Sequence, residues 1–223
     1  MTEAHAVAYA ELRERVTALV CDLAPAELER PAPATPGWRV RDVLAHMVGV
    51  TDDIVNGRFD GIASDPWTEA QVEKRRVVPL GDLLGDWAHY GPQFEALLGD
   101  APAAVAGQAL FDGMTHEQDV RHAVARPGAR DGDVMTLSWS WIVDARTSAG
   151  ATAIRLVSEH DDDIAGAGEP RATVRAPRFE LLRAMTGRRT PEEITGYQWE
   201  PAPDLELLLA APFFTIRTEP LGE

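Results

Sequence analysis

The sequence predicts an α+β protein in which an antiparallel four-helix bundle over residues 1–130 precedes a smaller α+β domain over residues 131–223. Three observations support this fold class. Before residue 127, apolar residues recur at three- and four-residue steps, the period of a helix with one buried face. Short to moderate connections rich in Pro and Gly separate these stretches, which favours antiparallel neighbours. After Gly128, short stretches alternate apolar and polar residues, as strands do.

The expected helices of the bundle cover residues 2–23, 38–56, 68–98 and 110–124. In the second of them the buried stripe is expected to comprise Val40, Val43, Leu44, Met47, Val50 and Ile54. The third is expected to break near Pro79–Gly81 and to bend at Pro92. Residues 24–37 and 99–109 are expected to be connections, and Arg126-Pro127-Gly128 is expected to end the bundle.

The second domain is expected to begin with a helix over residues 133–148. Strands are expected over residues 151–158 and 171–175, on either side of a turn at His160–Asp163. A helix around Phe179–Met185 should end at Gly187, and a helical turn should follow at residues 191–194. Phe213–Ile216 is the expected last strand.

Composition and charge exclude several classes of protein. Hydrophobic residues make up 45% of the 223 residues, ample for a core, and the net charge of −15 argues against nucleic acid or an anionic membrane as the partner. No apolar run is long enough to span a membrane, and the start of the chain lacks a signal pattern. Cys21 is the single cysteine, so we expect a cytoplasmic protein without an internal disulfide.

Two short stretches carry the candidate chemistry: Gly37–His46 and Asp112–Arg121. Asp112 and His116 are four residues apart, so on a helix their side chains point the same way, one turn apart. If this face meets the helix carrying His46, the three side chains would hold a metal ion. Three protein ligands with an open position are typical of catalytic zinc, and the set also matches non-haem iron. The alternative is that His46 is a hydrogen-bonded core residue.

Neighbouring charged residues suggest supporting roles. Asp42 stands in the first turn of its helix, which favours a role at the helix start over metal ligation. Asp119 either accepts a hydrogen bond from a ligand histidine or is an exposed surface charge. Arg183, Arg188 and Arg189 either complement the end of a helix or bind an anionic substrate. The sequence contains no GxGxxG, P-loop or GxSxG motif, which argues against nucleotide-dependent enzymes and serine hydrolases.

The order of these motifs resembles a known family. Trp38–His46, followed by the acidic-x-x-x-His pattern within Asp112–Arg121, resembles the DinB-like superfamily and most closely its mycothiol-dependent maleylpyruvate isomerase family. The stretch Phe179–Thr190, with Trp199 after it, is similar to the C-terminal region of that family. The resemblance therefore covers nearly the whole chain.

The resemblance implies a bundle that binds a divalent metal, usually zinc, with nickel or iron as other candidates. The implied ligands are His46, Asp112 and His116. The family more often has Glu at the acidic position, so with Asp112 the two helices must lie closer or the contact must pass through water. Arg39 stands where such helices often have a capping Ser or Thr, which would leave Asp42 without its capping-box partner.

The resemblance also implies an activity. The family uses the thiolate of mycothiol, activated by the metal, either to isomerise a conjugated acid such as maleylpyruvate or to transfer the thiol to a small electrophile. Arg188 and Arg189 are the candidates for holding a substrate carboxylate. A small-molecule thiol and an electrophile are the expected partners, and a homodimer is compatible with the resemblance. A non-catalytic protein that binds or senses a small molecule, and a non-haem iron oxygenase, remain as alternatives.

Overall fold

A computed structural model describes residues 2–209 and 214–223 of the chain. The chain forms two compact units, Met1–Ala129 and Arg130–Glu223. Each unit has its own core, and the two are described separately below.

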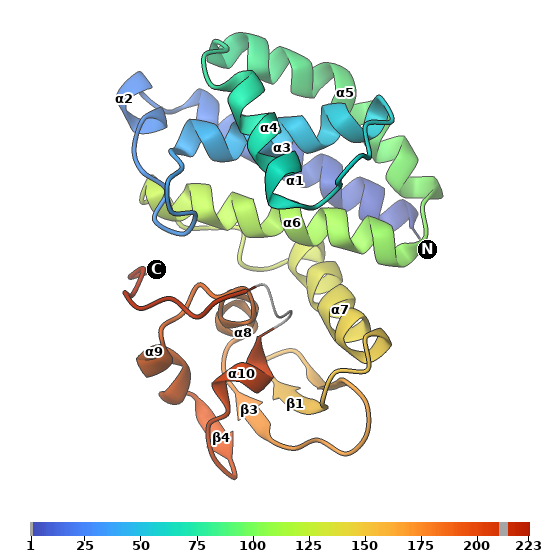
Figure 1. Cartoon of the computed structure of the whole chain (residues 1–223), viewed down its shortest axis with the longest axis vertical. Coiled ribbons are helices and arrows are strands. Elements are labelled where there is room, and N and C mark those ends of the chain that lie inside the picture. The colour runs from blue at the N-terminus through green and yellow to red at the C-terminus, as the bar shows by residue number, and fades with distance from the viewer. Residues whose placement is uncertain (1, 210–213) are drawn as a thin grey trace. The chain divides into compact units, whose positions relative to one another are not determined.

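Unit 1 is a helical bundle (Figure 1). Its helices are α1 (Glu3–Cys21), α2 (Pro25–Leu28), α3 (Val40–Val55), α4 (Asp65–Arg75), α5 (Leu80–Asp100) and α6 (Ala103–Ala123). The four long helices α1, α3, α5 and α6 pack against one another, and α4 packs on α3. The predicted four-helix bundle is confirmed, and its core residues come from all four long helices: Leu12, Val16, Val20, Leu44, Met47, Leu83, Trp87, Phe94 and Leu110.

The expected break near Pro79–Gly81 is confirmed, because α4 ends at Arg75 and α5 begins at Leu80. The helix boundaries differ from the prediction in two places: the short helix α2 lies in the stretch expected to be a connection, and α6 begins at Ala103, well before residue 110. Pro79 and Pro102 each directly precede the first residue of a helix, with extended backbone (ψ 145° and 142°), so each proline starts a helix there.

The start of α3 is fixed by Asp42. Its carboxylate accepts a hydrogen bond from the backbone N–H of Arg39 at 2.9 Å, and also pairs with the Arg39 guanidinium at 2.8 and 2.9 Å. The Arg39 guanidinium has only donors and cannot accept from the N–H of Asp42, so the capping box lacks that half, as expected. Asp42 supplies the other half through the backbone N–H of Arg39, and the guanidinium adds an ion pair. Burial raises the pKa of Asp42, but the hydrogen bonds and charge of Arg39 outweigh it and hold the pKa below its ordinary value.

Unit 2 combines a small sheet with helices. Its elements are α7 (Asp133–Ser148), β1 (Ile154–Val157), β2 (Asp162–Ala165), β3 (Thr173–Arg175), α8 (Arg178–Met185), α9 (Pro191–Thr195), β4 (Gln198–Glu200) and α10 (Leu205–Leu208). The strand order is β2-β1-β3-β4, with β1 and β3 parallel and the other pairs antiparallel. This mixed sheet confirms the α+β class.

The strands of unit 2 differ from the prediction at two places. Strand β2 was not expected, and because it begins at Asp162, which pairs with Val157, the turn is shorter than the expected turn at His160–Asp163. The fourth strand is β4 rather than Phe213–Ile216: residues 214–216 form no strand, and Phe213 lies outside the described residues. The short strand β4 is made by pairing with β3, a non-local contact that the local pattern does not indicate.

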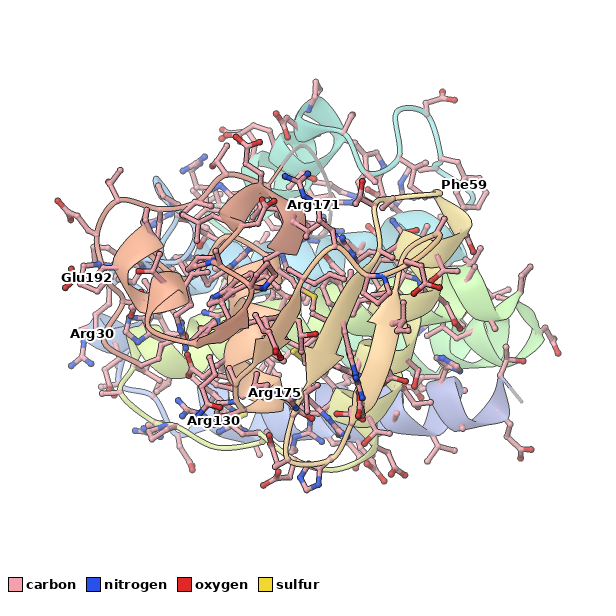
Figure 2. The ribbon with its side chains drawn as sticks, turned by 90° about the horizontal axis from the view of Figure 1, so that it is seen from below. Arg30, Phe59, Arg130, Arg171, Arg175 and Glu192 are labelled. Atoms are coloured by element: carbon pink, nitrogen blue, oxygen red, sulfur yellow. The ribbon has the colours of Figure 1, made fainter. Side chains whose placement is uncertain are left out.

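Charged side chains are spread over the surface. Arg171, Arg175 and Glu192 of unit 2 are exposed, and Phe59 in the loop between α3 and α4 is an exposed aromatic residue of unit 1 (Figure 2). Within the described part of the chain, none of the helices has the length and hydrophobicity needed to cross a membrane.

We predict that Asp42→Asn lowers the free energy of unfolding by about 1–2 kcal/mol at neutral pH, because Asn keeps an acceptor for the backbone N–H of Arg39 but loses the charge-assisted pairing with its guanidinium. The pKa of Asp42 is depressed in the folded protein, so its contribution is present above the ordinary Asp pKa and is lost as the pH falls through the folded pKa. The difference from wild type should therefore shrink under acid conditions. Urea denaturation of wild type and Asp42→Asn at neutral and acid pH measures the two free energies of unfolding. A difference between them that does not change with pH would contradict this account of Asp42.

Candidate metal centre

The packing of α3 against α6 brings His46, Asp112 and His116 together. One potential ligand atom from each lies within 4.8 Å of the others. His46 Nε2 is 3.6 Å from Asp112 Oδ2, and His116 Nε2 is 3.6 Å from Asp112 Oδ1. Each oxygen of the carboxylate thus faces one imidazole nitrogen.

The two separations between Asp112 and the histidines fit a metal ion. A tetrahedral zinc ion with bonds of about 2.0–2.2 Å separates its ligand atoms by about 3.3–3.6 Å. The donor set of two neutral nitrogens and one carboxylate suits zinc and other divalent transition metals. Although Asp112 is shorter than glutamate, the separations of 3.6 Å are compatible with direct ligation. The assignment of these three residues as ligands remains a prediction that the geometry supports.

The cluster is open on the side of Asp112. The side chains of His46 and His116 are 6% and 12% exposed, whereas that of Asp112 is 42% exposed. Three ligands leave a fourth position of a tetrahedral ion for another molecule. The geometry therefore suits a site that binds a small molecule better than a closed structural site.

Trp38 lies beside both imidazole rings. The centroid of its ring system lies 5.5 Å from the ring of His46 and 6.3 Å from the ring of His116, and the two imidazoles are 4.9 Å apart. A turn holds it there: the N–H of Trp38 donates to the carbonyl of Thr35 at 3.0 Å, and its own carbonyl accepts from the N–H of Ala32 at 2.8 Å. Trp38 thus shields one side of the rings from water.

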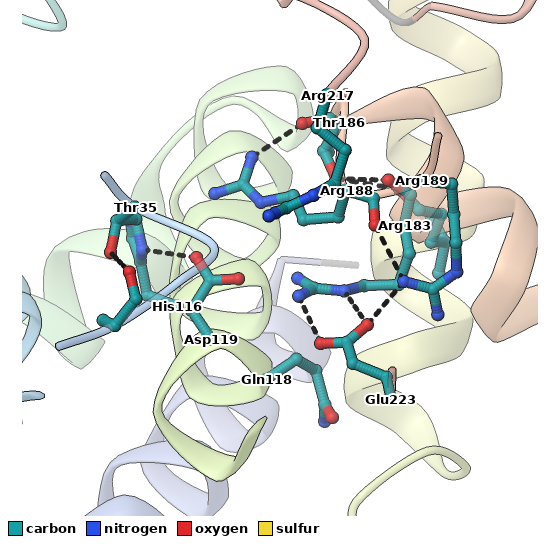
Figure 3. A network of polar contacts seen from close by, with 12 residues as sticks. Thr35, His116, Gln118, Asp119, Arg183, Thr186, Arg188, Arg189, Arg217 and Glu223 are labelled. Carbon is teal, nitrogen blue, oxygen red and sulfur yellow. Dashed lines mark hydrogen bonds and ion pairs between the residues drawn. The ribbon is translucent and has the colours of Figure 1, made fainter. Parts of the chain in front are cut away.

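The ring of His116 is held by Asp119. His116 Nδ1 lies 3.2 Å from Asp119 Oδ2, and the Asp119 side chain is fully buried (Figure 3). The interpretation of Asp119 as a surface charge is therefore wrong, and the hydrogen-bonding role is confirmed. Because Nδ1 faces Asp119, Nε2 is left to face Asp112.

The ring of His46 is held by a residue that the sequence did not single out. His46 Nδ1 lies 2.8 Å from Oε1 of Gln71 on α4, and Gln71 Nε2 donates to Asp53 Oδ2 at 2.9 Å. Asp53 lies two turns after His46 on the same face of α3, and this spacing could have indicated from the sequence that Asp53 lies on the side of the helix that carries the site. For Gln71 there was no such local signal, because its contact depends on how α4 packs.

Tyr9 of α1 lies behind the cluster. Its hydroxyl is 3.3 Å from the hydroxyl of Thr51, and the side chain is buried. Burial raises the pKa of Tyr9 to about 12; the hydrogen bond between Tyr9 and Thr51 opposes this, and the charge of Asp112 adds to it. Tyr9 is therefore a neutral hydroxyl at physiological pH. Beside it, Gly113 leaves room for α1, since an added Cβ would lie 3.4 Å from the Tyr9 ring.

The predicted arginines lie in unit 2, around an ion-pair cluster (Figure 3). Arg189 is buried and binds both oxygens of Glu180, at 2.6 and 2.9 Å, as well as Glu223 at 2.6 Å. Arg183 binds both oxygens of Glu223, at 2.9 and 2.5 Å. Arg188 is half-buried and donates to the carbonyl of Thr186 at 2.8 Å. The cluster is thus built to bind carboxylates, and its role toward a substrate remains a prediction.

The fold and the cluster together define a DinB-like helical bundle that carries two histidines and a carboxylate between two helices and continues into an α+β unit. A family model described as the mycothiol maleylpyruvate isomerase N-terminal domain matches residues 9–127, more than half of the chain. The chain therefore belongs to the mycothiol maleylpyruvate isomerase family.

Solved structures support the same fold. A crystal structure of a point mutant of the mycothiol-dependent maleylpyruvate isomerase matches with a TM-score of 0.62 and 11% identity, covering 92% of this chain and 95% of that one. A crystal structure of the mycothiol-dependent maleylpyruvate isomerase matches with a TM-score of 0.56 and 13% identity, again covering 92% of this chain and 95% of that one. A comparison with curated proteins returned no match.

We predict that the purified protein binds a single divalent ion per chain at this cluster. His46→Ala or His116→Ala should weaken zinc binding by more than about 100-fold, since loss of a ligand costs more than the loss of its supporting contacts. Competition with a chromogenic chelator measures the affinity. His89→Ala is the matched control, because His89 is exposed on α5 and lies outside the cluster. Equal zinc affinity in all four proteins would contradict the prediction.

Proposed function

We propose that this protein is a metal-dependent, thiol-using enzyme whose metal, zinc in the first instance, is held by His46, Asp112 and His116. Its thiol would be mycothiol, and its reaction the isomerisation of a conjugated acid such as maleylpyruvate, or transfer of the thiol to a small electrophile. The observation that carries the proposal is the cluster of three ligand atoms within 4.8 Å in a chain of this family.

The domain roles follow from the placement of these residues. Unit 1 would bind the metal, because all three proposed ligands lie on α3 and α6. Bound there, the ion would supply a Lewis acid that lowers the pKa of a thiol, so that a thiolate is present at neutral pH. Unit 2 would contribute arginines that bind the substrate carboxylate.

The residues of the site have distinct tasks in this proposal. His46 and His116 present Nε2 inward, because Gln71 and Asp119 occupy their Nδ1 atoms. Asp112 supplies negative charge on the open side of the cluster, where a thiol and its substrate have access. Trp38 covers the rings and limits water there.

The carboxylate-binding task is supported by the contacts inside unit 2. Arg183 and Arg189 already hold the buried carboxylate of Glu223. Burial raises the pKa of Glu223, but the two guanidinium groups outweigh it and keep the pKa below its ordinary value. Arg183 and Arg189 are thus occupied by Glu180 and Glu223, and Arg188, the half-buried member of this stretch, is the arginine that we assign to a substrate carboxylate.

We predict that the metal-loaded protein isomerises maleylpyruvate, or consumes another electrophile, only when mycothiol is present. His46→Ala should lower the rate by about 10³-fold or more, since metal catalysis contributes several kcal/mol to transition-state stabilisation. Absorbance assays with and without mycothiol measure this. His89→Ala is again the matched control.

The outcomes also separate the alternatives. Tight binding of a thiol without turnover would favour a non-catalytic binding or sensing protein. A reaction that needs Fe(II) and oxygen would favour a non-haem iron oxygenase. Either outcome would contradict the proposed reaction.

We predict that Arg188→Ala raises the KM for a carboxylate substrate roughly 10–100-fold, the size of a lost charge-assisted hydrogen bond, without changing zinc affinity. Arg175→Ala, an exposed arginine of β3, is the matched control. Arg189→Ala should instead lower stability by about 3–5 kcal/mol, because Glu223 would be left buried beside one cation fewer. Steady-state kinetics and urea denaturation measure these effects; an unchanged KM would contradict the role of Arg188.

A further inference from the structure

A chain of three hydrogen bonds leads from His46 to solvent. Nδ1 of His46 contacts Oε1 of Gln71 at 2.8 Å, Nε2 of Gln71 contacts Oδ2 of Asp53 at 2.9 Å, and Oδ1 of Asp53 contacts Nε of Arg58 at 2.7 Å. The first three residues are buried, with exposures of 4%, 1% and 9%, whereas the Arg58 side chain is 44% exposed.

The direction of these hydrogen bonds is determined by Asp53. An ionised carboxylate can only accept hydrogen bonds, so Gln71 must turn its NH₂ group toward Asp53. The carbonyl oxygen of Gln71 then faces His46, and an oxygen of an amide can only accept. Nδ1 of His46 must therefore carry the hydrogen, and in the neutral ring Nε2, which lies 3.6 Å from Asp112, carries the lone pair.

We propose that Gln71 and Asp53 are positioning residues that hold His46 in the Nδ1–H tautomer, the form in which Nε2 can bind a metal. The inference deepens the proposed function and rests on it for its purpose. The tautomer itself depends only on residues of this chain, so it is set before any ion binds.

The two histidines are positioned in different ways. His116 contacts the buried carboxylate of Asp119 directly, on its own helix. The carboxylate on the helix of His46 is two turns away, and the amide of Gln71 bridges the distance from α4. Asp53 orients the neutral amide of Gln71, and the amide oxygen then accepts a hydrogen bond from His46. The ring of His46 therefore has no full negative charge directly against its Nδ1.

A close approach of α4 to α3 makes the bridge possible. A Cβ at Gly49 would lie 2.6 Å from Cβ and 2.8 Å from Cγ of Gln71, and 3.0 Å from Nη1 of Arg75. Arg75 is buried and pairs with Asp52 of α3 at 2.5 Å. The buried residues of α4 are Gln71, Val72 and Arg75, so polar contacts to α3 dominate its docking. The absence of a side chain at Gly49 thus allows α4 to support the site.

The test measures the tautomer of His46 in metal-free protein. Long-range ¹H–¹⁵N correlation spectra of histidine-labelled protein distinguish Nδ1–H from Nε2–H, at about pH 8, where an ordinary imidazole is neutral. Wild type should show Nδ1–H at His46. Asp53→Asn should populate Nε2–H, because an asparagine lets the amide of Gln71 turn around. Zinc affinity, by chelator competition, should fall about 10–100-fold.

Three further variants separate positioning from stability. The double variant Gln71→Glu with Asp53→Asn should restore Nδ1–H, since an acceptor-only carboxylate then faces His46 and an amide donor faces that carboxylate. Glu73→Gln should leave the tautomer unchanged, because Glu73 is an exposed residue of α4 that pairs with Arg76 and not with Gln71. Gly49→Ala should lower zinc affinity although it removes no polar group.

Each outcome bears on the inference. An Nε2–H tautomer in wild type, or an unchanged tautomer in Asp53→Asn without effect on zinc affinity, would overturn it. Nδ1–H in wild type that is lost in Asp53→Asn and regained in the double variant would support it. If that pattern appears and wild type nevertheless binds no zinc, the positioning role of Gln71 and Asp53 is supported and the proposed metal-dependent function fails.

Discussion

The candidate site depends on how closely α3 and α6 pack. Only at this separation do the imidazoles of His46 and His116 lie 4.9 Å apart, with one carboxylate, Asp112, facing both. The bundle core sets the separation, because buried apolar side chains of both helices fix how far apart their axes lie. A shorter acidic side chain than the family usually has therefore still reaches both rings.

Three buried carboxylates of unit 1 are paired with arginines. Asp42 is bound by Arg39, Asp52 by Arg75 and Arg58, and Glu117 by Arg15 and Arg121. A buried charge is tolerated only when its partners satisfy it, so these pairs restrict how the helices can pack. Asp112 differs from these buried carboxylates, because its side chain is 42% exposed on the open side of the cluster.

Local spacing predicted part of this site, and the family resemblance predicted more. The i, i+4 pair Asp112 and His116 follows from helix geometry, and the role of Asp119 was one of two interpretations of the same pattern. The pairing with His46 came from the order of motifs, since no local rule joins residues on different helices. Gln71 was missed for the same reason: its contact depends on the close approach at Gly49, which only the packed structure shows. The strand β4 was likewise missed because its partner β3 is distant in sequence.

The central claim is that two imidazoles and the carboxylate of Asp112 hold one metal ion between α3 and α6. X-ray absorption spectroscopy of the zinc-loaded protein tests it most directly, because multiple scattering from imidazole rings reports how many histidines bind. The account predicts two imidazole ligands with nitrogen or oxygen neighbours at about 2.0–2.2 Å, and one imidazole in His46→Ala if that variant retains zinc. A spectrum with no imidazole scattering, or one that is identical in His46→Ala, would contradict it.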